Sequence, residues 1–531
     1  MRSRTAFRLH MAILLGLSVS GIVPVDARAA DCASLARIEL ANTTVTAAAA
    51  VPAGTFTPPQ GPPIRNLPAF CRVTGVIIAA SDSNIQFEVW MPSPGWNGKF
   101  QGVGNGGFAG TIGWGEMAAA VAQGYAAAGT DTGHQGGAVD ASWALGHPQK
   151  VIDFGYRAIH ETAAKAKALV AAFYGESPKH SYFSACSNGG RQALMEAQRY
   201  PADYDGIIAG APANYWTHLL TGALWDQEAL LLDSASYIPA NKLPAVEAAT
   251  LAACDALDGV KDGVIDDPTQ CHFDPSVLLC KGPETDTCLT EPQVTALRKI
   301  YSGPRNSKGA PVFPGYSPGG EIGGGGWTLW ITGASREKSL GYGFGTQFFI
   351  NMLYENAAWD YRTFNVDRDM KAADDKLGRT MNATDADLKR FQARGGKLIV
   401  YHGWSDAAIP PLNAIDYYKS VVAKMGAKES DRFLRLYMVP GMQHCGGGPG
   451  PNSFGALSVS SGDAQHDMAR ALERWVEEGT APDQIVATKY KTGANPASGV
   501  ARTRPLCPYP QAAHWKGTGS TDDAANFVCA K

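Results

Sequence analysis

A serine lies between a short apolar segment and a stretch with helical periodicity, in the pattern Ala185-Cys186-Ser187-Asn188-Gly189. A sharp turn from a strand into a helix lifts a serine hydroxyl above the sheet, and the strained, closely packed backbone there requires small neighbours. We therefore predict that Ser187 is a nucleophile, although Ala185 stands where glycine is usual. The alternative is a serine that only caps the following helix.

A serine alcohol becomes a good nucleophile when a histidine takes its proton and a carboxylate holds that histidine in one tautomer. Two segments further along, 401–406 and 440–446, each follow a predicted strand and offer these partners. Loops at the ends of strands are where such a sheet presents its reactive groups. We predict Asp406 as the carboxylate and His444 as the base.

Other residues could take these two roles. His402 could be the base, but it precedes the loop, and we expect it to be packed where it positions Asp406. Asp416 and Asp431 are weaker carboxylate candidates, because both lie in the predicted intervening helix or at its exit.

Two cysteines flank the predicted catalytic residues. Cys186 precedes Ser187 and Cys445 follows His444, so a hydrogen bond between serine and histidine brings the two cysteines within bridging range. We predict a disulfide between them. The alternative, a reactive Cys186 thiol, requires a free thiolate near a base.

The first residues have the pattern of an export signal. Arginines at positions 2, 4 and 8 precede an apolar run over 11–25 and then Ala27-Arg28-Ala29, which predicts a signal peptide over 1–29 and a secreted or periplasmic protein. The ten cysteines are then expected to form disulfides. No later stretch reaches the roughly 20 apolar residues of a membrane span.

The net charge of −3 is small. Nucleic acids and anionic membranes favour a strongly basic face, so we expect neither as a partner. The expected partner is a small molecule, and the sequence does not predict the oligomeric state.

Strand-like and helix-like segments alternate around these motifs. This alternation predicts an α/β protein with a mostly parallel sheet covered on both faces. A helix is expected over 159–173, ended by Gly175, and a second over 189–200. The expected strands are 73–79, 85–91, 99–103, 125–130, 182–184, 206–209, 397–401 and 433–439.

The chain is longer than one hydrophobic core usually accommodates. The alternation breaks where glycine, proline and tryptophan become frequent, which predicts an inserted domain over 213–390 between two parts of one core, 30–212 and 391–531. The later insertion is rich in aromatic side chains that could form flat apolar walls for a planar ring, although ordinary core packing is as good an explanation for any one of them. They are Trp327, Trp330, Tyr342, Phe344, Phe348 and Phe349.

Five aspartates crowd into residues 255–267 with glycines between them, and Cys254 and Cys271 flank the segment. Mutual repulsion of the carboxylates calls for a cation, and hard oxygen ligands with glycine turns favour calcium over zinc. The alternative is a solvated acidic loop. Asp266 and Asp267 have no assigned role.

Three motifs resemble the tannase and feruloyl esterase family, which includes a hydrolase of mono-hydroxyethyl terephthalate. They are 186–190, 402–406 and 441–445, and the resemblance spans nearly the whole mature chain. It implies an α/β-hydrolase fold with a large inserted lid domain and a triad whose neighbours are joined by a disulfide. The remaining family-like pairings are Cys32 with Cys71, Cys254 with Cys271, Cys280 with Cys288, and Cys507 with Cys529.

The resemblance also implies a structural calcium ion. Its ligands would be the side chains of Asp255, Asp258 and Asp262 and the carbonyl groups of Val260 and Val264.

Ester hydrolysis needs donors aimed at the oxyanion of the tetrahedral intermediate. One is expected to be the Asn188 amide. In hydrolases of this type the second comes from a glycine-rich loop after an early strand, a place that 104–108 fills. We predict Gly107, with Gly106 as the alternative, and a plain turn would be the non-catalytic explanation.

These observations together predict a secreted serine carboxylesterase that hydrolyses esters of aromatic acids, such as feruloyl or galloyl esters, through an acyl-enzyme. A terephthalate monoester is an alternative substrate. Less favoured alternatives are a secreted serine peptidase and a binding module without activity.

Overall fold

The computed structural model describes residues 1, 31–456 and 463–531, so the predicted signal peptide after Met1 lies outside the described residues. In the described part, a nine-stranded sheet runs in the order β1-β4-β5-β7-β6-β8-β9-β10-β11. Its strands are β1 (Thr43–Val51), β4 (Phe70–Ile77), β5 (Ile85–Pro92), β6 (Lys99–Val103), β7 (Ala126–Thr130), β8 (His180–Cys186), β9 (Gly206–Gly210), β10 (Lys397–Gly403) and β11 (Leu434–Val439).

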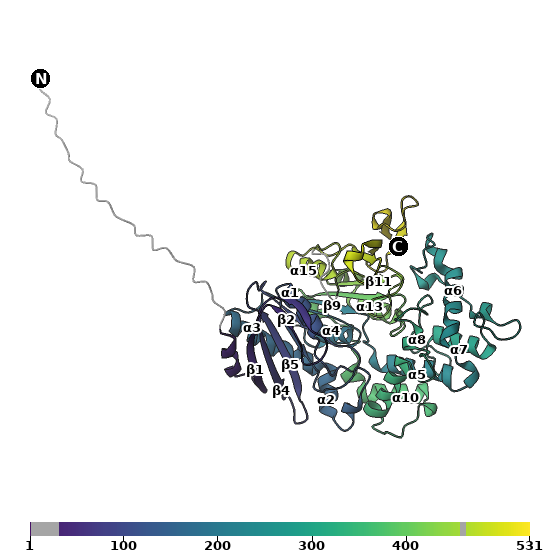
Figure 1. Ribbon diagram of the computed structural model, residues 1–531, viewed down its shortest axis with the longest axis horizontal. Coiled ribbons are helices and arrows are strands. Elements are labelled where there is room, and N and C mark those ends of the chain that lie inside the picture. The colour runs from purple at the N-terminus through teal and green to yellow at the C-terminus, as the bar shows by residue number, and fades with distance from the viewer. Residues whose placement is uncertain (2–30, 457–462) are drawn as a thin grey trace.

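The sheet is mixed. The strands from β7 through β6, β8, β9 and β10 to β11 are parallel, as predicted. The pairs β1–β4, β4–β5 and β5–β7 are antiparallel. Every expected strand is present in the sheet, whereas β1, rich in alanine and threonine, was not predicted. The antiparallel strands lie together at one side of the molecule (Figure 1).

Helices cover both faces of the parallel region, which is the layer arrangement that the alternation predicted. One face packs against α3 (Ala158–Tyr174), α4 (Asn188–Arg199) and α13 (Leu412–Met425), and their buried apolar residues share one core with the strands. The other face packs against α1 (Trp114–Ala122) and α15 (Met468–Glu478). Helix α3 ends, as expected, at Gly175, which has a φ of 78°.

A long helical region separates β9 from β10. Its buried side chains form one core together with residues of the segment 108–154, such as Phe108 and Phe154, and it lies beside the sheet on the side away from β1 (Figure 1). Its helices are α5 (Trp216–Leu231), α6 (Leu243–Cys254), α7 (Glu291–Ser302), α8 (Trp327–Trp330), α9 (Leu340–Gln347), α10 (Val366–Ala373), α11 (Arg379–Met381) and α12 (Lys389–Ala393).

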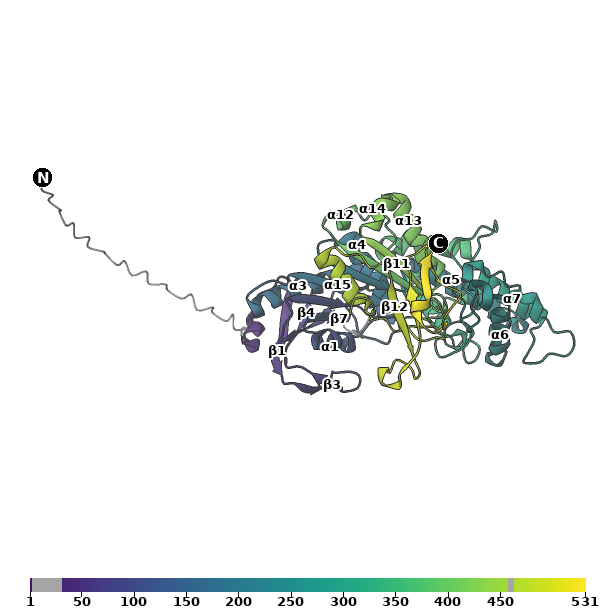
Figure 2. The ribbon, with the colours of Figure 1, turned by 90° about the horizontal axis from the view of Figure 1, so that it is seen from above.

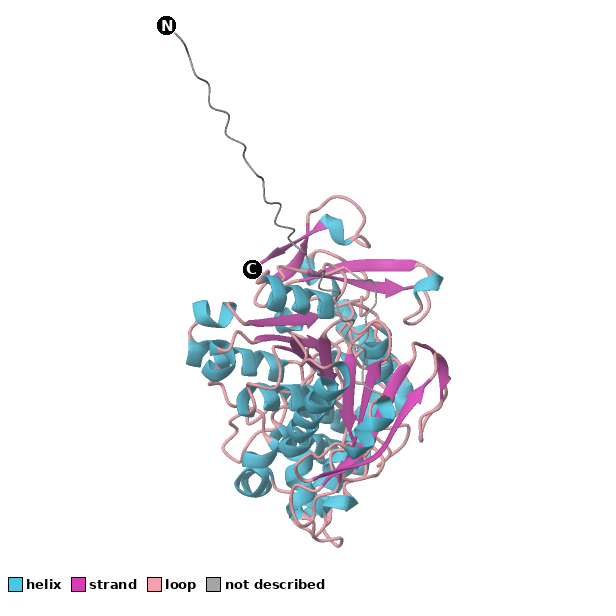
Figure 3. Ribbon diagram, turned by 90° about the vertical axis from the view of Figure 1, so that its left-hand side faces the viewer, coloured by secondary structure: helices cyan, strands magenta, loops and turns pink. Residues whose placement is uncertain are grey.

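Short strand pairs and two further helices complete the strands and α-helices of the described residues. The C-terminal pairs lie close together near the end of the chain (Figures 2 and 3). These elements are α2 (Pro148–Ile152), α14 (Ala427–Asp431), the pair β2 (Gly54–Phe56) and β3 (Ile64–Leu67), the pair β12 (Ile485–Tyr490) and β13 (Val500–Leu506), and the pair β14 (Ala512–Trp515) and β15 (Phe527–Ala530). Within the described ranges, no helix is both long enough and apolar enough to cross a membrane.

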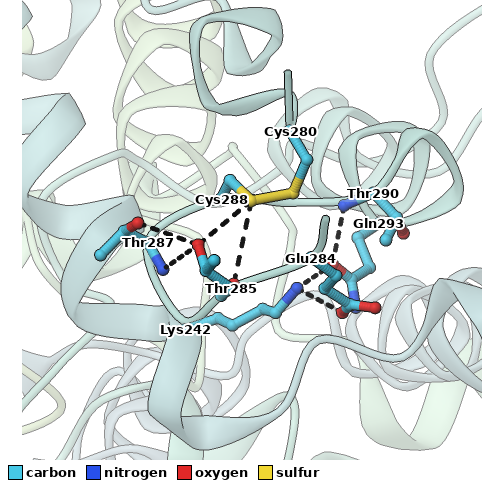
Figure 4. Close-up of a disulfide and its surroundings, with 8 residues drawn as sticks. All are labelled: Lys242, Cys280, Glu284, Thr285, Thr287, Cys288, Thr290 and Gln293. Atoms are coloured by element: carbon cyan, nitrogen blue, oxygen red, sulfur yellow. Dashed lines mark hydrogen bonds and ion pairs between the residues drawn. A yellow bond between two sulfur atoms is a disulfide. The ribbon is translucent and has the colours of Figure 1, made fainter. Parts of the chain in front are cut away.

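Disulfides join segments of both the sheet region and the helical region. Figure 4 shows the Cys280–Cys288 bond beside Lys242, a buried ammonium that pairs with Glu284 at 2.5 Å and donates to Gln293 at 2.9 Å. This polar group ties the turn between the two cysteines to α7. The five bonded pairs are Cys32–Cys71, Cys186–Cys445, Cys254–Cys271, Cys280–Cys288 and Cys507–Cys529.

Candidate active site

Ser187 lies at the turn between β8 and α4. Its φ of 68° and ψ of −126° lie outside the regions that residues with a Cβ ordinarily occupy. Such strain persists only where the surroundings enforce it. Here the Ser187 amide donates to Gly210 O at 2.9 Å, and the Ser187 carbonyl accepts from Arg191 N and Ala213 N, both at 3.1 Å. Hydrogen bonds with α4 and with the segment 210–213 at the end of β9 therefore hold the strained turn.

The methyl group of Ala185, which departs from the usual motif, fits because two glycines surround it. A Cβ at Gly189 would lie 2.5 Å from the Ala185 methyl group, and a Cβ at Gly104 would lie 2.7 Å from it. Both distances are far shorter than a carbon–carbon contact. Glycines at 104 and 189 thus provide the space that the alanine fills.

The structure brings Ser187, His444 and Asp406 together in a hydrogen-bonded chain. His444 Nε2 lies 2.9 Å from Ser187 Oγ, and His444 Nδ1 lies 2.9 Å from Asp406 Oδ2. Ser187 follows β8, Asp406 follows β10 and His444 follows β11. In the sheet, β10 and β11 are adjacent, and only β9 lies between β8 and β10. This is the arrangement in which a histidine removes the serine proton and a carboxylate orients the ring.

Asp406 is buried and surrounded by donors. Its Oδ1 accepts from the amides of Ala408 at 2.8 Å and Ile409 at 3.0 Å. Burial by itself would raise the pKa of the Asp406 carboxyl, but His444 and His402 outweigh it and hold that pKa below its usual range. Asp406 is therefore a carboxylate throughout the neutral range.

His402 contacts Asp406 but not the serine. It is fully buried, and its Nε2 lies 3.1 Å from Asp406 Oδ2 and 3.0 Å from Ile409 O. The imidazole of His402 thus contacts the same carboxylate oxygen that His444 contacts, Oδ2. The other two carboxylate candidates lie elsewhere, Asp416 on α13 and Asp431 at the end of α14, where it pairs with Arg435.

The Cys186–Cys445 disulfide lies directly behind the serine and the histidine. Its Cα atoms are 6.0 Å apart, and it joins residues separated by 259 positions in the sequence. Cys445 has a φ of 60°, which is uncommon for a residue with a side chain. The bond ties the end of β8 to the loop after β11.

The glycine-rich loop 104–108 lies against the N-terminal end of α4. Gly107 has a φ of 56°, and a Cβ there would lie 2.2 Å from Ala138 O, so only glycine fits. At Gly106 a Cβ would meet no atom within 4 Å. The close approach of a second segment at Gly107 makes a simple surface turn a poor description of this loop.

Asn105 and Gln192, which the sequence analysis did not identify, connect this loop to α4. Gln192 Oε1 accepts from Asn105 N at 3.1 Å, and Gln192 Nε2 donates to Asn105 Oδ1 at 2.7 Å. Asn105 Nδ2 also donates to Thr130 O at 2.6 Å. In the sequence, the only available signal was that Gln192 follows the candidate serine by five residues. Its partner Asn105 is distant in sequence, so the pairing could not be predicted.

Arg191 is a second residue that the sequence analysis missed. Its guanidinium is fully buried, donates to Asn188 Oδ1 at 2.9 Å and reaches the carbonyl groups of Gly155 at 2.8 Å and Phe154 at 3.0 Å. Burial lowers the pKa of Arg191 to about 9. The side chain therefore holds the first turn of α4 against the segment before α3.

Aromatic side chains from the helical region lie beside His444. The Trp330 ring is 5.0 Å from the imidazole in an edge-on arrangement, and Phe344 lies 6.2 Å from Trp330 and 5.4 Å from Phe108. Trp330 and Phe344 are partly exposed, whereas the remaining predicted aromatic residues are buried in the core or pack on other rings. The remaining residues are Trp327, Phe348 and Phe349, which are buried, and Tyr342, which packs on Tyr361.

A polar contact connects the helical region to the histidine loop. Gln443 is buried, donates to Ile322 O at 2.6 Å and accepts from Gly325 N at 3.1 Å. Ser405 Oγ donates to Gly319 O at 2.7 Å from the other loop. The glycine-rich segment 319–326 is thereby held against the residues that precede Asp406 and His444.

The acidic loop lies between α6 and the C-terminal strands. Asp255 accepts from the amides of Asp262 and Gly263, each at 3.1 Å, and Asp258 accepts from Val260 N at 2.9 Å. Asp262 Oδ2 accepts from Arg502 at 2.7 Å and from Arg504 at 2.5 Å on β13. The side chain of Asp262 therefore also links this loop to the C-terminal hairpin.

Asp266 gives the acidic loop a chemical feature that fits a cation. Asp266 is buried, and neither of its carboxylate oxygens has a hydrogen-bond partner. Burying such a group without a partner is costly. Ionised, the four carboxylates exceed the two nearby guanidinium groups by two negative charges, which matches a divalent cation. The carboxylates are Asp255, Asp258, Asp262 and Asp266, and the guanidinium groups are Arg502 and Arg504.

Comparison with known proteins places the chain among esterases. A family model described as tannase and feruloyl esterase matches residues 71–530. An uncharacterised esterase of Xanthomonas campestris is 46% identical, over 96% of this chain and 93% of its own length. Mono(2-hydroxyethyl) terephthalate hydrolase of Piscinibacter sakaiensis is 35% identical, over 87% of this chain and 85% of its own length.

A solved structure extends the likeness to three dimensions. The crystal structure of feruloyl esterase B from Aspergillus oryzae is 31% identical and superposes with a TM-score of 0.86. The match covers 94% of this chain and 99% of that chain. Both the sheet region and the helical region between β9 and β10 therefore have a counterpart in that structure.

Proposed function

Because the chain belongs to the tannase and feruloyl esterase family and is a carboxylic ester hydrolase, we propose that it hydrolyses esters of aromatic acids through an acyl-enzyme on Ser187. Phenolic acyl groups such as feruloyl or galloyl are the favoured class. Family membership also favours an esterase over a peptidase or a binding module without activity.

The observation that carries this proposal is the hydrogen-bonded chain from Ser187 through His444 to Asp406, with Trp330 beside the imidazole. His444 takes the proton of Ser187 as the oxygen attacks the ester carbonyl, and Asp406 stabilises the imidazolium. His444 then gives the proton to the leaving alcohol. Water, activated by the same histidine, releases the acid and restores the serine.

We assign the oxyanion donors to the amides of Asn188 and Gly107. One such donor commonly contributes about 3 kcal/mol to the stabilisation of the transition state. Support comes from the strained turn that starts α4 at Asn188 and from the Asn105–Gln192 pair, which fixes the glycine loop relative to that helix.

The aromatic acyl group is the finer part of the proposal. Trp330 and Phe344 come from the helical region and are partly exposed, so that these two rings provide an apolar wall beside the triad, and the buried ring of Phe108 packs against Phe344. Planar rings pack well on such walls. A terephthalate monoester is a second candidate, because a relative that is 35% identical carries that activity in its name.

A substrate panel with a nucleophile variant tests the proposal. We expect methyl ferulate, methyl gallate or a terephthalate monoester to be hydrolysed with a higher kcat/KM than p-nitrophenyl acetate. Ser187→Ala should lose at least about 10⁴-fold in kcat while its circular dichroism spectrum is unchanged. The control Ser184→Ala, on the same strand, should keep most of its activity. A folded Ser187→Ala variant with wild-type turnover would overturn the nucleophile assignment.

We further propose that the acidic loop binds a structural calcium ion. The expected ligands are the carboxylates of Asp255, Asp258 and Asp262 and the carbonyl groups of Val260 and Val264, and the buried Asp266 carboxylate supports a cation there. The ion would neutralise the carboxylates and stabilise the loop.

We also propose that the protein is secreted or periplasmic, because five disulfides favour an oxidising compartment.

A further inference from the structure

A second polar cluster lies at the far end of the helix that carries the nucleophile. Glu196 is on α4, nine residues after Ser187, which corresponds to about 13 Å along the helix. His160 comes from α3 and Asp203 from the loop between α4 and β9. The ligand atoms of these three side chains lie within 4.8 Å of one another. None of the three takes part in the proposed ester hydrolysis.

The orientation of two of these side chains is fixed by neighbours. The His160 ring stacks on Tyr200 at 3.8 Å, and its Nδ1 lies 2.6 Å from Asp203 Oδ2. The Lys167 ammonium donates to the main-chain carbonyl of Asp203, so the Asp203 carboxylate remains turned toward the imidazole. The side chains of His160 and Asp203 are 32% and 14% exposed, so an ion could reach them from solvent.

Glu196 lacks any hydrogen-bonding partner for its charge. It is only 1% exposed, and neither carboxylate oxygen has a hydrogen-bond partner. Burial raises the pKa of Glu196 well above its usual range, the neighbouring Asp203 carboxylate adds to this effect, and the Lys167 ammonium opposes it without outweighing it. A buried carboxylate next to a second carboxylate needs either a proton or a cation between them.

We propose that His160, Glu196 and Asp203 bind a divalent transition-metal ion, with Zn²⁺ as the best match. One imidazole nitrogen and two carboxylate oxygens are a donor set that zinc accepts, and water would complete the tetrahedron. Two carboxylates balance the charge of the ion, and the Lys167 ammonium nearby is hydrogen-bonded to the main-chain carbonyl of Asp203. Zinc bonds of about 2.0–2.2 Å place tetrahedral ligands about 3.3 Å apart, so side-chain shifts of roughly 1 Å would close the site.

The role of such an ion would be structural. It would join α3, α4 and the loop before β9, and α4 begins at the strained turn of Ser187. The metal would therefore support the helix behind the nucleophile without touching the substrate. It is distinct from the acidic loop, whose ligands are oxygens only.

The test is zinc binding by the untagged, metal-depleted full-length protein with calcium restored in excess. Isothermal titration calorimetry should give one strong site, and Zn²⁺ at about 100-fold over its Kd should raise Tm by a few degrees. Co²⁺ in place of Zn²⁺ should give visible absorption bands of a four-coordinate ion. These readouts do not depend on ester hydrolysis.

Two variants locate the site. His160→Phe keeps an aromatic ring on Tyr200 but removes the nitrogen ligand, and Glu196→Gln imitates a protonated glutamic acid that donates to Asp203. Both should remain folded and lose at least about tenfold in zinc affinity. His514→Ala, which removes an exposed histidine, should bind as the wild type does. Absence of zinc binding by the wild type, or wild-type zinc affinity in both variants, would overturn the proposal, and Glu196 would then be a protonated partner of Asp203.

Discussion

At the scale of single residues, the site depends on two histidines that contact the same oxygen of one carboxylate, Asp406 Oδ2. His444 lies between Ser187 and Asp406, whereas His402 reaches only Asp406 and Ile409 O. The pKa of Asp406 is held below its usual range, since the two imidazoles outweigh the effect of burial. Asp406 thus stays ionised and can stabilise a positive charge on His444.

Replacing this carboxylate should remove most of the activity. Asp406→Asn keeps the shape but favours the wrong tautomer of His444, and we expect kcat to fall by about 10⁴-fold at neutral pH. Steady-state kinetics on the best ester of the panel measures the loss. His402→Gln should lose less, because His402 only positions Asp406. Equal losses in the two variants would contradict this division of roles.

At the scale of elements, the loops after β8 and β11 are joined by one covalent bond. The Cys186–Cys445 disulfide connects neighbours of Ser187 and His444 across 259 positions. The hydrogen bond between serine and histidine depends on the relative position of these loops.

We predict that the double variant Cys186→Ala, Cys445→Ala folds but hydrolyses esters poorly. Misplacing a catalytic group by about 1 Å can cost on the order of 100-fold in rate, whereas the large core and the other disulfides still support the fold. Circular dichroism and kcat are measured together. The control Cys280→Ala, Cys288→Ala removes a bond far from Ser187 in sequence and should leave kcat unchanged. Free thiols at 186 and 445 in active wild-type protein would refute the prediction.

The short helix α8 carries the aromatic ring that lies beside the imidazole. We expect Trp330→Ala to lower kcat/KM for methyl ferulate by about tenfold or more while p-nitrophenyl acetate is affected less, because the acetyl group does not need the wall. Trp330→Phe should restore most of the selectivity. Equal losses on both esters would place Trp330 in folding or general positioning instead.

At the scale of the whole molecule, the acidic loop connects the helical region to the C-terminal hairpin. Asp262 pairs with Arg502 and Arg504 on β13, and Arg504 also lies over the ring of Phe527, 3.9 Å from its centroid. Gln443 and Ser405 connect the glycine-rich segment 319–326 to the catalytic loops. A change in the stability of the acidic loop should therefore affect the contact between the helical region and the C-terminal hairpin.

Removal of calcium should lower the stability of the whole protein. With the cation gone, the clustered carboxylates repel one another, so we expect Tm to fall in a chelator and to recover with added calcium but not with magnesium. Thermal unfolding of a preparation verified by elemental analysis provides the measurement. Asp262→Asn and Asp258→Asn should weaken the calcium response. An unchanged Tm in metal-free protein would exclude the proposed site.

The sequence by itself determined the fold class and the family, because both are encoded in short segments. The strained turn at Ser187 needs small neighbours, and strands and helices differ in apolar spacing, so 99–103 was predicted with the bounds of β6. Residue types adjacent to Ser187 and His444 were sufficient to pair Cys186 with Cys445, whereas the other pairs came from the family resemblance.

Only the tertiary structure decided which distant residues meet. Gln192 finds Asn105, Trp330 but not the buried Trp327 reaches His444, and Glu196 lies without a hydrogen-bond partner beside Asp203. The strand β1 and the C-terminal hairpins also lacked a readable apolar pattern. Such contacts depend on the packing of helices and strands that are far apart in the chain. Local periodicity shows which side of an element is buried, but it does not specify which partner a side chain will contact.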